Sequence, residues 1–331
     1  MLYVGRAGGA EEKITSALQI PFQRIRVGGL RSMGAVTQAR NFAQMVQASR
    51  AAANVIALFQ PNVILATGGY VSAPVLWAGW RKKIPIVIEL PDLEPGWAIR
   101  ATWRLSNQVA VSFDEVLKFF ARGRATVTGY PVRAEFFQAT RQAGRAHFQL
   151  DENVPVVTVF GGSQGAHALN EAVRMNLREL LRETQIIHVC GTRDKMQLDA
   201  ERALLEANLA ARYHVFDYLS DGMPLALAAA DVVVARAGAA TLGEFPAVGV
   251  PSILVPGLFA QGHQDKNADF LESRGAAVKL PEEKLASEFL ATIKKLVRAE
   301  TRLNEMRAAV KKLARPDAAE RIGNLLFEYA R

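Results

Sequence analysis

Short, almost entirely apolar runs alternate with helix-length segments along the whole chain, and this alternation constrains the fold most strongly. Clear examples are PIVIEL (85–90), VPVVTVF (154–160) and DVVVA (231–235). A strand with one face in water would alternate apolar and polar residues, whereas these runs suit strands that are buried on both faces. Helices between such strands cover the two faces of a parallel sheet. The sequence therefore predicts an α/β protein built on parallel sheets.

The strand-like runs form two series, and a chain of 331 residues fits two domains of about 150 residues each better than one core. We expect a doubly wound, Rossmann-like domain over residues 1–136 and a second one over 150–312. The join lies near residues 133–151. An amphipathic segment over 317–331 follows Pro316, and we expect it to form a helix that crosses back to the first domain.

Composition excludes several classes of protein. The single cysteine, Cys190, rules out a disulfide framework and argues against a thiolate metal site, so we interpret it as structural. The apolar runs are strand-length and fall short of the roughly 20 residues that span a bilayer. The amino terminus lacks the pattern of a cleaved signal, which favours a cytoplasmic protein. We expect no metal and no cofactor.

Positive charge is concentrated in the first half of the chain. Residues 1–150 hold 18 Lys+Arg and 8 Asp+Glu, a net charge of +10, whereas residues 151–331 hold 22 and 24, a net of −2. Zinc-finger spacing and aromatic RNA-binding motifs are absent from the sequence, so we expect no nucleic acid partner. The segment VLWAGWRKK (75–83) sets two tryptophans beside three cations, which suits an anionic membrane surface. The alternative is a surface helix with Trp77 and Trp80 packed inward.

Glycines and polar residues collect directly after the strand-like runs. In doubly wound folds ligands bind beyond the carboxyl ends of the strands, so these segments predict a binding site at that edge of each sheet. The segments are GGYVSAP (68–74), PDLEPG (91–96), YPVR (130–133), GGSQGAHALN (161–170), RAGAATLGE (236–244) and GLFAQGHQDKNA (257–268).

The segment GGSQGAHALN, between a buried strand and a helix, has two interpretations. It is either a tight βα connection or a cradle in which backbone N–H groups at a helix start face a phosphate. A nicotinamide-dependent dehydrogenase is disfavoured, because GxGxxG spacing is missing and no acidic residue ends the next strand, TQIIHVCG.

Taken together, these segments resemble the MurG family. The matching residues run in order over nearly the whole chain: GGYVSAP, GYPVR, GGSQGAHALN, MPLALAAADVVVARAGAATLGE, GVPSILVP and HQDKNA. The resemblance implies a GT-B fold, with two doubly wound domains facing across a cleft. It implies an inverting transfer of N-acetylglucosamine from UDP-GlcNAc to the polyprenyl-diphosphate-linked muramyl-pentapeptide, lipid I to lipid II, in peptidoglycan synthesis. The expected location is peripheral, at the cytoplasmic face of the bacterial plasma membrane.

The resemblance also assigns residues to the donor site. It implies that the glycine turn faces the diphosphate, that Glu244 accepts hydrogen bonds from the ribose hydroxyls, and that His263 and Gln264 meet the sugar. The full donor-binding set that it implies is Gly162, Ser163, Gln164, Gly165, Arg236, Ala239, Ala240, Thr241, Glu244, His263, Gln264 and Asn267.

The first domain departs from the family in two places. The opening strand and its glycine-rich loop, which carries the family's leading candidate for the general base, do not precede LYVG (2–5). The family's His-Glu-Gln-Asn segment is replaced by Glu89, Leu90, Pro91 and Asp92, and Asp92 becomes the candidate base, with Glu89 and Glu94 as other carboxylates nearby. The acceptor-side residues that the resemblance implies are Gly68, Gly69, Tyr70, Ser72 and Arg133.

Two alternatives stay open. The chain could bind UDP-GlcNAc without turnover, because the loop with the candidate base is missing. It could also be another GT-B enzyme, either a nucleotide-sugar epimerase or a transferase acting on a different lipid, although the basic first domain disfavours the epimerase.

Overall fold

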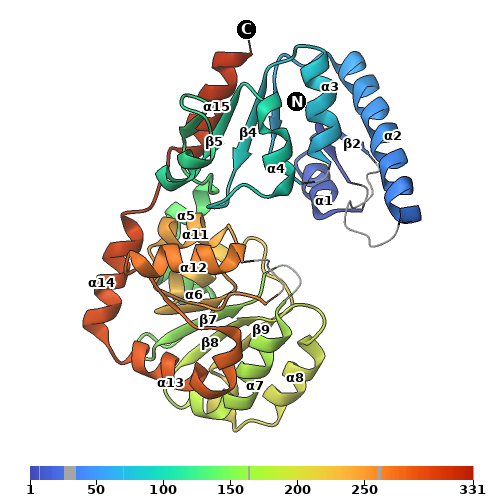
Figure 1. Cartoon of the computed structure of the whole chain (residues 1–331). Helices are drawn as coiled ribbons and strands as arrows, with labels where there is room; N and C mark the ends of the chain where they lie inside the picture. Colours follow the sequence, from blue (N-terminus) through green and yellow to red (C-terminus); the bar gives the residue numbers. More distant parts are fainter. Residues whose placement is uncertain (7, 26–34, 70, 163–164, 259–261, 331) are drawn as a thin grey trace. The chain divides into compact units, whose positions relative to one another are not determined.

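The computed structural model describes residues 1–6, 8–25, 35–69, 71–162, 165–258 and 262–330. These residues form two compact units, one from residues 1–129 with 317–331 and one from residues 130–316 (Figure 1). The division falls at Tyr130, so residues 130–136, which we expected in the first domain, belong to the second unit.

The second unit is built on a six-stranded, fully parallel sheet. Its order is β12-β11-β10-β7-β8-β9, the 3-2-1-4-5-6 order of a doubly wound sheet. Successive strands are added in one direction from β7 and in the opposite direction from β10, and these two parallel strands are neighbours, with Val157 paired to Val232. The strands are β7 (Val156–Phe160), β8 (Gln185–Val189), β9 (Tyr213–Phe216), β10 (Val232–Ala235), β11 (Ser252–Leu254) and β12 (Ala277–Lys279).

Alternate residues of β7 enter different cores because successive side chains of a strand point to opposite faces. Val157 and Val159 pack with Leu169 and Phe289 on one face. Val156 packs on the other face with Ala226.

The helices of the second unit are α5 (Ala134–Gln138), α6 (Arg141–His147), α7 (His167–Leu181), α8 (Lys195–Ala203), α9 (Ala207–Ala210), α10 (Met223–Ala229), α11 (Thr241–Val248), α12 (His263–Ser273), α13 (Leu285–Val297) and α14 (Glu300–Lys311), with the short 3-10 helix η3 (Glu282–Lys284).

Asp231, just before β10, is the centre of an ionic cluster in the second unit. Arg145 Nη2 and Arg307 Nη2 donate to its carboxylate at 2.9 and 3.0 Å, Arg141 donates to both of its oxygens, and Val156 N donates at 2.9 Å. Burial opposes ionisation of Asp231, but these donors keep its pKa below the ordinary value. Arg145 is fully buried, so the cluster ties α6 and α14 to the amino ends of β7 and β10.

Among the described residues, the first unit holds two separate parallel sheets. The order of the larger sheet is β3-β4-β5-β6, and β1 pairs only with β2 among the described residues. In a doubly wound sheet of order 3-2-1-4, another strand separates the strands that correspond to β1 and β3. The strands are β1 (Tyr3–Gly5), β2 (Phe22–Arg24), β3 (Ile64–Ala66), β4 (Ile86–Leu90), β5 (Gln108–Val111) and β6 (Ala125–Val127).

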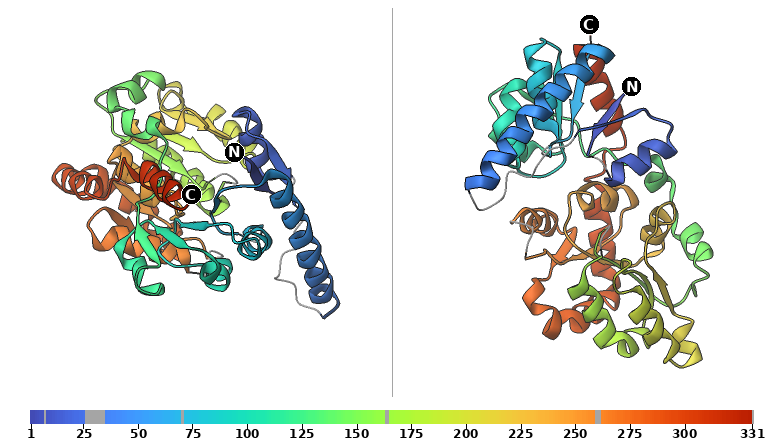
Figure 2. Two further views of the ribbon diagram at one scale, coloured as in Figure 1. Left: turned by 90° about the horizontal axis from the view of Figure 1, so that it is seen from above. Right: turned by 90° about the vertical axis from the view of Figure 1, so that its right-hand side faces the viewer.

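The carboxy-terminal helix α15 (Ala318–Tyr329) packs on the larger sheet of the first unit. Its Ile322 and Leu325 form a core cluster with Val87 of β4 and Ala110 of β5. The 25-residue helix α2 packs beside α3, and its length is clear in both views of Figure 2. The helices of this unit are α1 (Ala10–Ala17), α2 (Ala35–Phe59), α3 (Ser72–Arg81), α4 (Trp97–Thr102) and α15, with the 3-10 helices η1 (Trp103–Leu105) and η2 (Asp114–Phe119).

Over the described ranges, none of the helices combines the length and the apolar character that crossing a bilayer requires. Within the same ranges, His, Cys, Asp and Glu side chains form no group of three or more that could hold a metal ion.

Candidate functional site

The turn between β7 and α7 requires glycine at positions 161 and 165. A Cβ added to Gly161 would lie 2.2 Å from Ala166 N, and one added to Gly165 would lie 2.2 Å from Cys190 O. Gly162 and Gly165 also have positive φ angles of +89° and +76°, where side chains are strained. Ser163 and Gln164 lie outside the described residues.

The turn delivers the chain into the start of α7. The first amides of a helix have no acceptor inside the helix, and Ala166 at the N-cap position provides no side-chain cap. These amides are therefore free to bind an anion, and the 15-residue helix adds the positive end of its dipole. The connection is therefore tight, as the first interpretation of GGSQGAHALN requires, and the phosphate cradle stays a prediction.

A buried chain of polar side chains lies behind this turn. Asn170 of α7, which is 1% exposed, donates through Nδ2 to Cys190 O at 2.8 Å and to Asp194 Oδ2 at 2.7 Å. Its Oδ1 lies 3.0 Å from His188 Nε2, and His188 Nδ1 lies 2.8 Å from the Tyr213 hydroxyl. The chain joins α7 to β8, β9 and the loop before α8, so it fixes the position of the turn.

The hydrogen bonds identify the tautomer of His188. Burial lowers its pKa to about 3, against the charge of Asp194, so the imidazole is neutral. Because both Asn170 amide protons go to other oxygens, Asn170 Oδ1 must accept from His188 Nε2–H. Nδ1 then accepts from the Tyr213 hydroxyl. The sequence offered little signal for this chain of contacts beyond a polar residue inside the apolar run of β8.

Glu244 lies on the first turn of α11, directly after the β10 turn. Burial raises its pKa to about 7, against the charge of Arg133, which lowers it. The two residues come close because Gly243 packs on Tyr130: a Cβ added to Gly243 would lie 2.2 Å from Tyr130 Cδ1. No described residue donates a hydrogen bond to the Glu244 side chain. A half-buried carboxylate to which no described residue donates is suited to a ligand that presents hydroxyl groups.

Arg236, a predicted donor-site residue, is engaged inside the protein. Its Nη1 and Nη2 donate to the two oxygens of Glu282 at 2.9 and 2.8 Å, and Nη1 also lies 3.3 Å from the carbonyls of Val255 and Pro256. Glu282 accepts in addition from Leu258 N at 3.0 Å, and the hydrogen bond from Arg236 lowers its pKa. The guanidinium therefore shapes the edge of the site by joining β10, β11 and η3, through a partner that the sequence analysis missed.

Other predicted residues of this edge also hold the loops in place. Gln264 accepts from Gly257 N at 2.8 Å, and buried Asn267 donates to Ala237 O at 3.0 Å. Thr241 donates to Gly238 O at 2.7 Å, which shapes the turn that holds half-buried Ala239 and Ala240. His263 is the first residue of α12.

The edge of the larger sheet in the first unit carries a second group of predicted residues. Gly68 and Gly69 have φ angles of +87° and +79°, and Ser72 donates to Gly68 O. Tyr70 lies outside the described residues. Arg133 does not belong to this group, because it lies in the second unit. There its positive charge lowers the pKa of Glu244.

Glu89 and Asp92 form a carboxylate pair at the end of β4. Glu89 is only 7% exposed, and burial, followed by the charge of Asp92, raises its pKa to about 7. A carboxyl group that titrates near neutral pH is suited to proton transfer. Asp92 makes interactions of its own and is not a free carboxylate.

Comparison with known proteins agrees with this arrangement of two units. The model of the glycosyltransferase family 28 N-terminal domain matches residues 2–111, and that of the family 28 C-terminal domain matches residues 156–322. The UDP-N-acetylglucosamine–N-acetylmuramyl-(pentapeptide) pyrophosphoryl-undecaprenol N-acetylglucosamine transferase of Roseiflexus sp. (strain RS-1) is 38% identical. That alignment covers 98% of this chain and 82% of the relative.

Solved structures share the fold. The crystal structure of Acinetobacter baumannii MurG has a TM-score of 0.75 at 25% identity and covers 98% of this chain and 90% of its own. UDP-GlcNAc 2-epimerase from Neisseria meningitidis, bound to UDP-GlcNAc, has a TM-score of 0.66 at 13% identity, with 96% and 88% covered, which is a likeness of fold alone. From its matched domains and its relatives, the chain belongs to glycosyltransferase family 28 and, within that family, to the MurG transferases.

Proposed function

We infer that this chain transfers N-acetylglucosamine from UDP-GlcNAc to the polyprenyl-diphosphate-linked muramyl-pentapeptide, which converts lipid I to lipid II in peptidoglycan synthesis. The observation that carries the donor half of this inference is the second unit's carboxyl edge. There, the glycine turn after β7 leads into helix-start amides that suit an anion, and the turn after β10 leads to the half-buried carboxylate of Glu244. These two strands flank the position at which doubly wound sheets bind nucleotides.

The donor is proposed to lie with its diphosphate at the first amides of α7 and its ribose hydroxyls at Glu244. Arg133, next to Glu244, adds a positive charge for the diphosphate. His263 at the start of α12 is proposed to contact the sugar, with Gln264 holding the loop before it. The proposed donor site also includes Gly162, Ser163, Gln164, Gly165, Arg236, Ala239, Ala240, Thr241 and Asn267.

The proposed reaction forms one bond and breaks one bond at the anomeric carbon. The acceptor hydroxyl oxygen attacks that carbon, the bond to the diphosphate oxygen breaks, and the electron pair leaves with UDP, with inversion of configuration. Amides at a helix start stabilise the negative charge that grows on the departing diphosphate, and this stabilisation favours the transition state over the bound substrate.

The hydroxyl proton is proposed to go to Asp92 or its partner Glu89. Burial, followed by the negative charge of Asp92, raises the pKa of Glu89, so this carboxylate takes up a proton more readily than an isolated one. Gly68, Gly69, Tyr70 and Ser72 form the acceptor-side loop in this proposal. The substitution Asp92→Asn should lower kcat while leaving the affinity for UDP unchanged, because the donor contacts belong to the other unit.

Attachment to the membrane is proposed to be peripheral and at the cytoplasmic face. Trp77 and Trp80 are 42% and 52% exposed, so neither ring is packed fully inward as the alternative interpretation required. Arg81, Lys82 and Lys83 follow them at the end of α3. Rings at the headgroup level beside cations suit an anionic surface, and salt should weaken this attachment.

A transfer assay tests the proposed function. Labelled UDP-GlcNAc and a lipid I analogue with a short prenyl chain should yield a disaccharide product and one UDP for each transfer. Binding of UDP-GlcNAc without transfer would favour the alternative of a binding protein. Conversion of UDP-GlcNAc to its C2 epimer would contradict the proposal and indicate an epimerase.

A further inference from the structure

An exposed tryptophan lies at the start of α4, at the carboxyl edge of the larger sheet in the first unit. Trp97 is 80% exposed, compared with 42% for Trp77 and 52% for Trp80. Because the Cα–Cβ bonds of a helix tilt toward its start, this side chain leaves α4 on the side of the loop 91–96, which follows β4. The roles proposed above leave this ring unassigned.

The ring is carried by a well-packed junction between loop and helix. Leu93 and Ile99 are 8% and 6% exposed, and Arg100 Nε donates to Pro95 O at 2.7 Å. A Cβ added to Gly68 would lie 3.3 Å from Ile99 Cδ1, so the first turn of α4 packs against the proposed acceptor-side loop. A ring that is held in place before a ligand arrives loses little freedom on binding.

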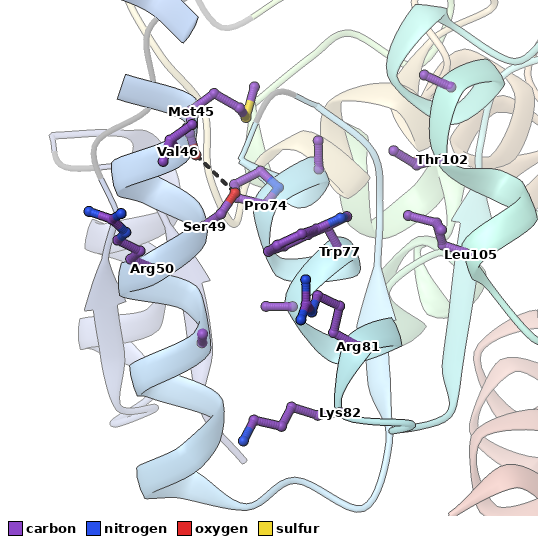
Figure 3. Close-up of a pocket in the computed structure, with 14 residues that line it drawn as sticks. Met45, Val46, Ser49, Arg50, Pro74, Trp77, Arg81, Lys82, Thr102 and Leu105 are labelled. Carbon is purple, nitrogen blue, oxygen red and sulfur yellow. Dashed lines mark hydrogen bonds between the residues drawn. The ribbon is translucent and has the colours of Figure 1, made fainter. Parts of the chain in front are cut away.

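The charge around Trp97 differs from the charge around the tryptophans of α3. Figure 3 shows Trp77 with Arg81 and Lys82 near it, and the Arg81 guanidinium lies 5.0 Å from the centre of the Trp77 ring. Residues 84–99 instead contain three acids and no Lys or Arg. An anionic lipid surface attracts cations and repels acids, so the segment around Trp97 is unsuited to it.

An aromatic face beside carboxylates suits a sugar. One face of a pyranose ring is lined by C–H groups and packs on an aromatic ring, whereas its hydroxyl groups need acceptors. Asp92 and Glu94 lie half-buried on the loop that leads to Trp97, and Glu89 ends the buried part of β4. Each carboxylate offers roughly four acceptor positions, so one that has a protein partner can also accept from a hydroxyl group.

We propose that Trp97 stacks on the muramyl ring of the acceptor and directs its hydroxyl group to the carboxylates of Glu89 and Asp92. The proposal rests on the transfer reaction inferred above and adds to it a residue that determines which acceptor is bound. The indole contacts the substrate and takes no proton, so its contribution is to position the attacking oxygen.

Steady-state kinetics in the absence of vesicles test the stack. With the short-prenyl lipid I analogue, Trp97→Ala should raise the acceptor KM about 10-fold or more and leave the KM for UDP-GlcNAc unchanged, because an aromatic contact and its buried area are lost. Trp97→Phe keeps a ring and should stay within about threefold of the parent, whereas Trp97→Leu keeps only an apolar side chain and should resemble Trp97→Ala. Equal acceptor KM values for Trp97→Phe and Trp97→Leu would overturn the stacking role.

A binding experiment tests the same contact without turnover. Water-soluble N-acetylmuramyl-pentapeptide would be mixed with the whole protein, and the aromatic resonances of the protein would be saturated in a saturation-transfer NMR experiment. The C–H protons of the sugar ring should receive saturation from the parent protein and lose most of it in Trp97→Leu. A parent that gives no such signal, or a Trp97→Leu variant with an undiminished one, would contradict the inference.

Two controls separate stacking from other roles of an exposed ring. Phe327→Ala removes a ring of α15 that is 78% exposed, and it should change neither the acceptor KM nor the saturation signal. Trp97→Ala should bind phosphatidylglycerol vesicles as tightly as the parent does. Weaker vesicle binding with an unchanged acceptor KM would assign Trp97 to the membrane and overturn the proposal.

The outcomes also keep this inference distinct from the proposed function. A saturation signal that Trp97→Leu loses, in a protein that transfers no N-acetylglucosamine, would support the stack and count against the transferase. Transfer with an acceptor KM that Trp97→Ala leaves unchanged would support the transferase and overturn the stack.

Discussion

Gly165 lies so close to the carbonyl oxygen of Cys190 that an added Cβ would be 2.2 Å from that oxygen. The same oxygen accepts a hydrogen bond from Asn170 at 2.8 Å. One backbone carbonyl at the end of β8 thus supports both the turn that precedes α7 and the first part of α7 itself. The position of the proposed phosphate cradle depends on this contact and on the buried polar chain behind it.

Substitution of Gly165 by alanine should therefore disrupt the turn. The methyl group meets backbone atoms that cannot move aside and also requires a φ of +76°. We expect a loss of at least about 2 kcal/mol in the free energy of unfolding, together with weaker UDP binding, from strain and overpacking combined. Urea denaturation and UDP titration would measure the two effects.

Gly162→Ala is the matched control for that substitution. Gly162 has a similar φ of +89°, but a Cβ there would meet nothing within 4 Å. Only backbone strain remains, at a cost of about 1 kcal/mol. Equal losses in the two variants would show that the contact with Cys190 has no special role.

The buried carboxyl of Glu89 predicts a pH dependence of stability. Its pKa in the folded protein is about 7, above the ordinary value of 4.5, so the folded state holds this proton more tightly than the unfolded chain. Stability contributed by this group is therefore greatest below about pH 4.5 and falls as the pH rises towards 7. Glu89→Gln should remove this decline and raise the free energy of unfolding at pH 8 by on the order of 2 kcal/mol.

The comparison at low pH provides the control for this prediction. At pH 4.5 both side chains are neutral in the folded state, so the parent and the Glu89→Gln variant should differ little in urea midpoint. Urea unfolding curves of both proteins, measured from pH 4.5 to 8, would show whether their stabilities diverge as the pH rises. If the two stability profiles stay parallel across that range, Glu89 does not titrate as the structure implies.

Removing the Asp231 carboxylate should lower the free energy of unfolding more than removing one of its exposed partners. Asp231→Ala leaves fully buried Arg145 without its counter-charge, and we expect a loss of about 3–5 kcal/mol in the free energy of unfolding. Arg307→Gln removes a partner whose side chain is 30% exposed, at an expected cost of about 1 kcal/mol or less. Urea denaturation of both variants would measure this ranking, and the reverse order would contradict the assignment of Asp231 as the centre.

Much of the fold could be predicted from the sequence because the strands are short and almost entirely apolar. VPVVTVF and DVVVA became β7 and β10 because nearly every side chain in them is buried, which leaves no competing surface position. The division of the first unit into two parallel sheets could not be predicted, because local sequence pattern does not indicate which strands pair.

The site was less predictable because its contacts join segments far apart in sequence. Arg236 carries the residue type expected of a phosphate ligand, yet its partner is Glu282, which no local spacing indicates. Arg133 follows the last strand of the first sheet, but the fold places it beside Glu244 of the second unit. Residue type and strand position located the edge of the site, and packing decided which side chains remain available there.

The donor site depends most directly on Glu244. Calorimetric titration of UDP into the parent protein and into Glu244→Ala is the most direct test. We predict that the parent binds UDP and that the variant binds it about 5- to 150-fold more weakly, because removing a half-buried hydrogen-bond partner of the ligand costs about 1–3 kcal/mol. Unchanged affinity in the variant, or a parent protein that does not bind UDP, would contradict the account.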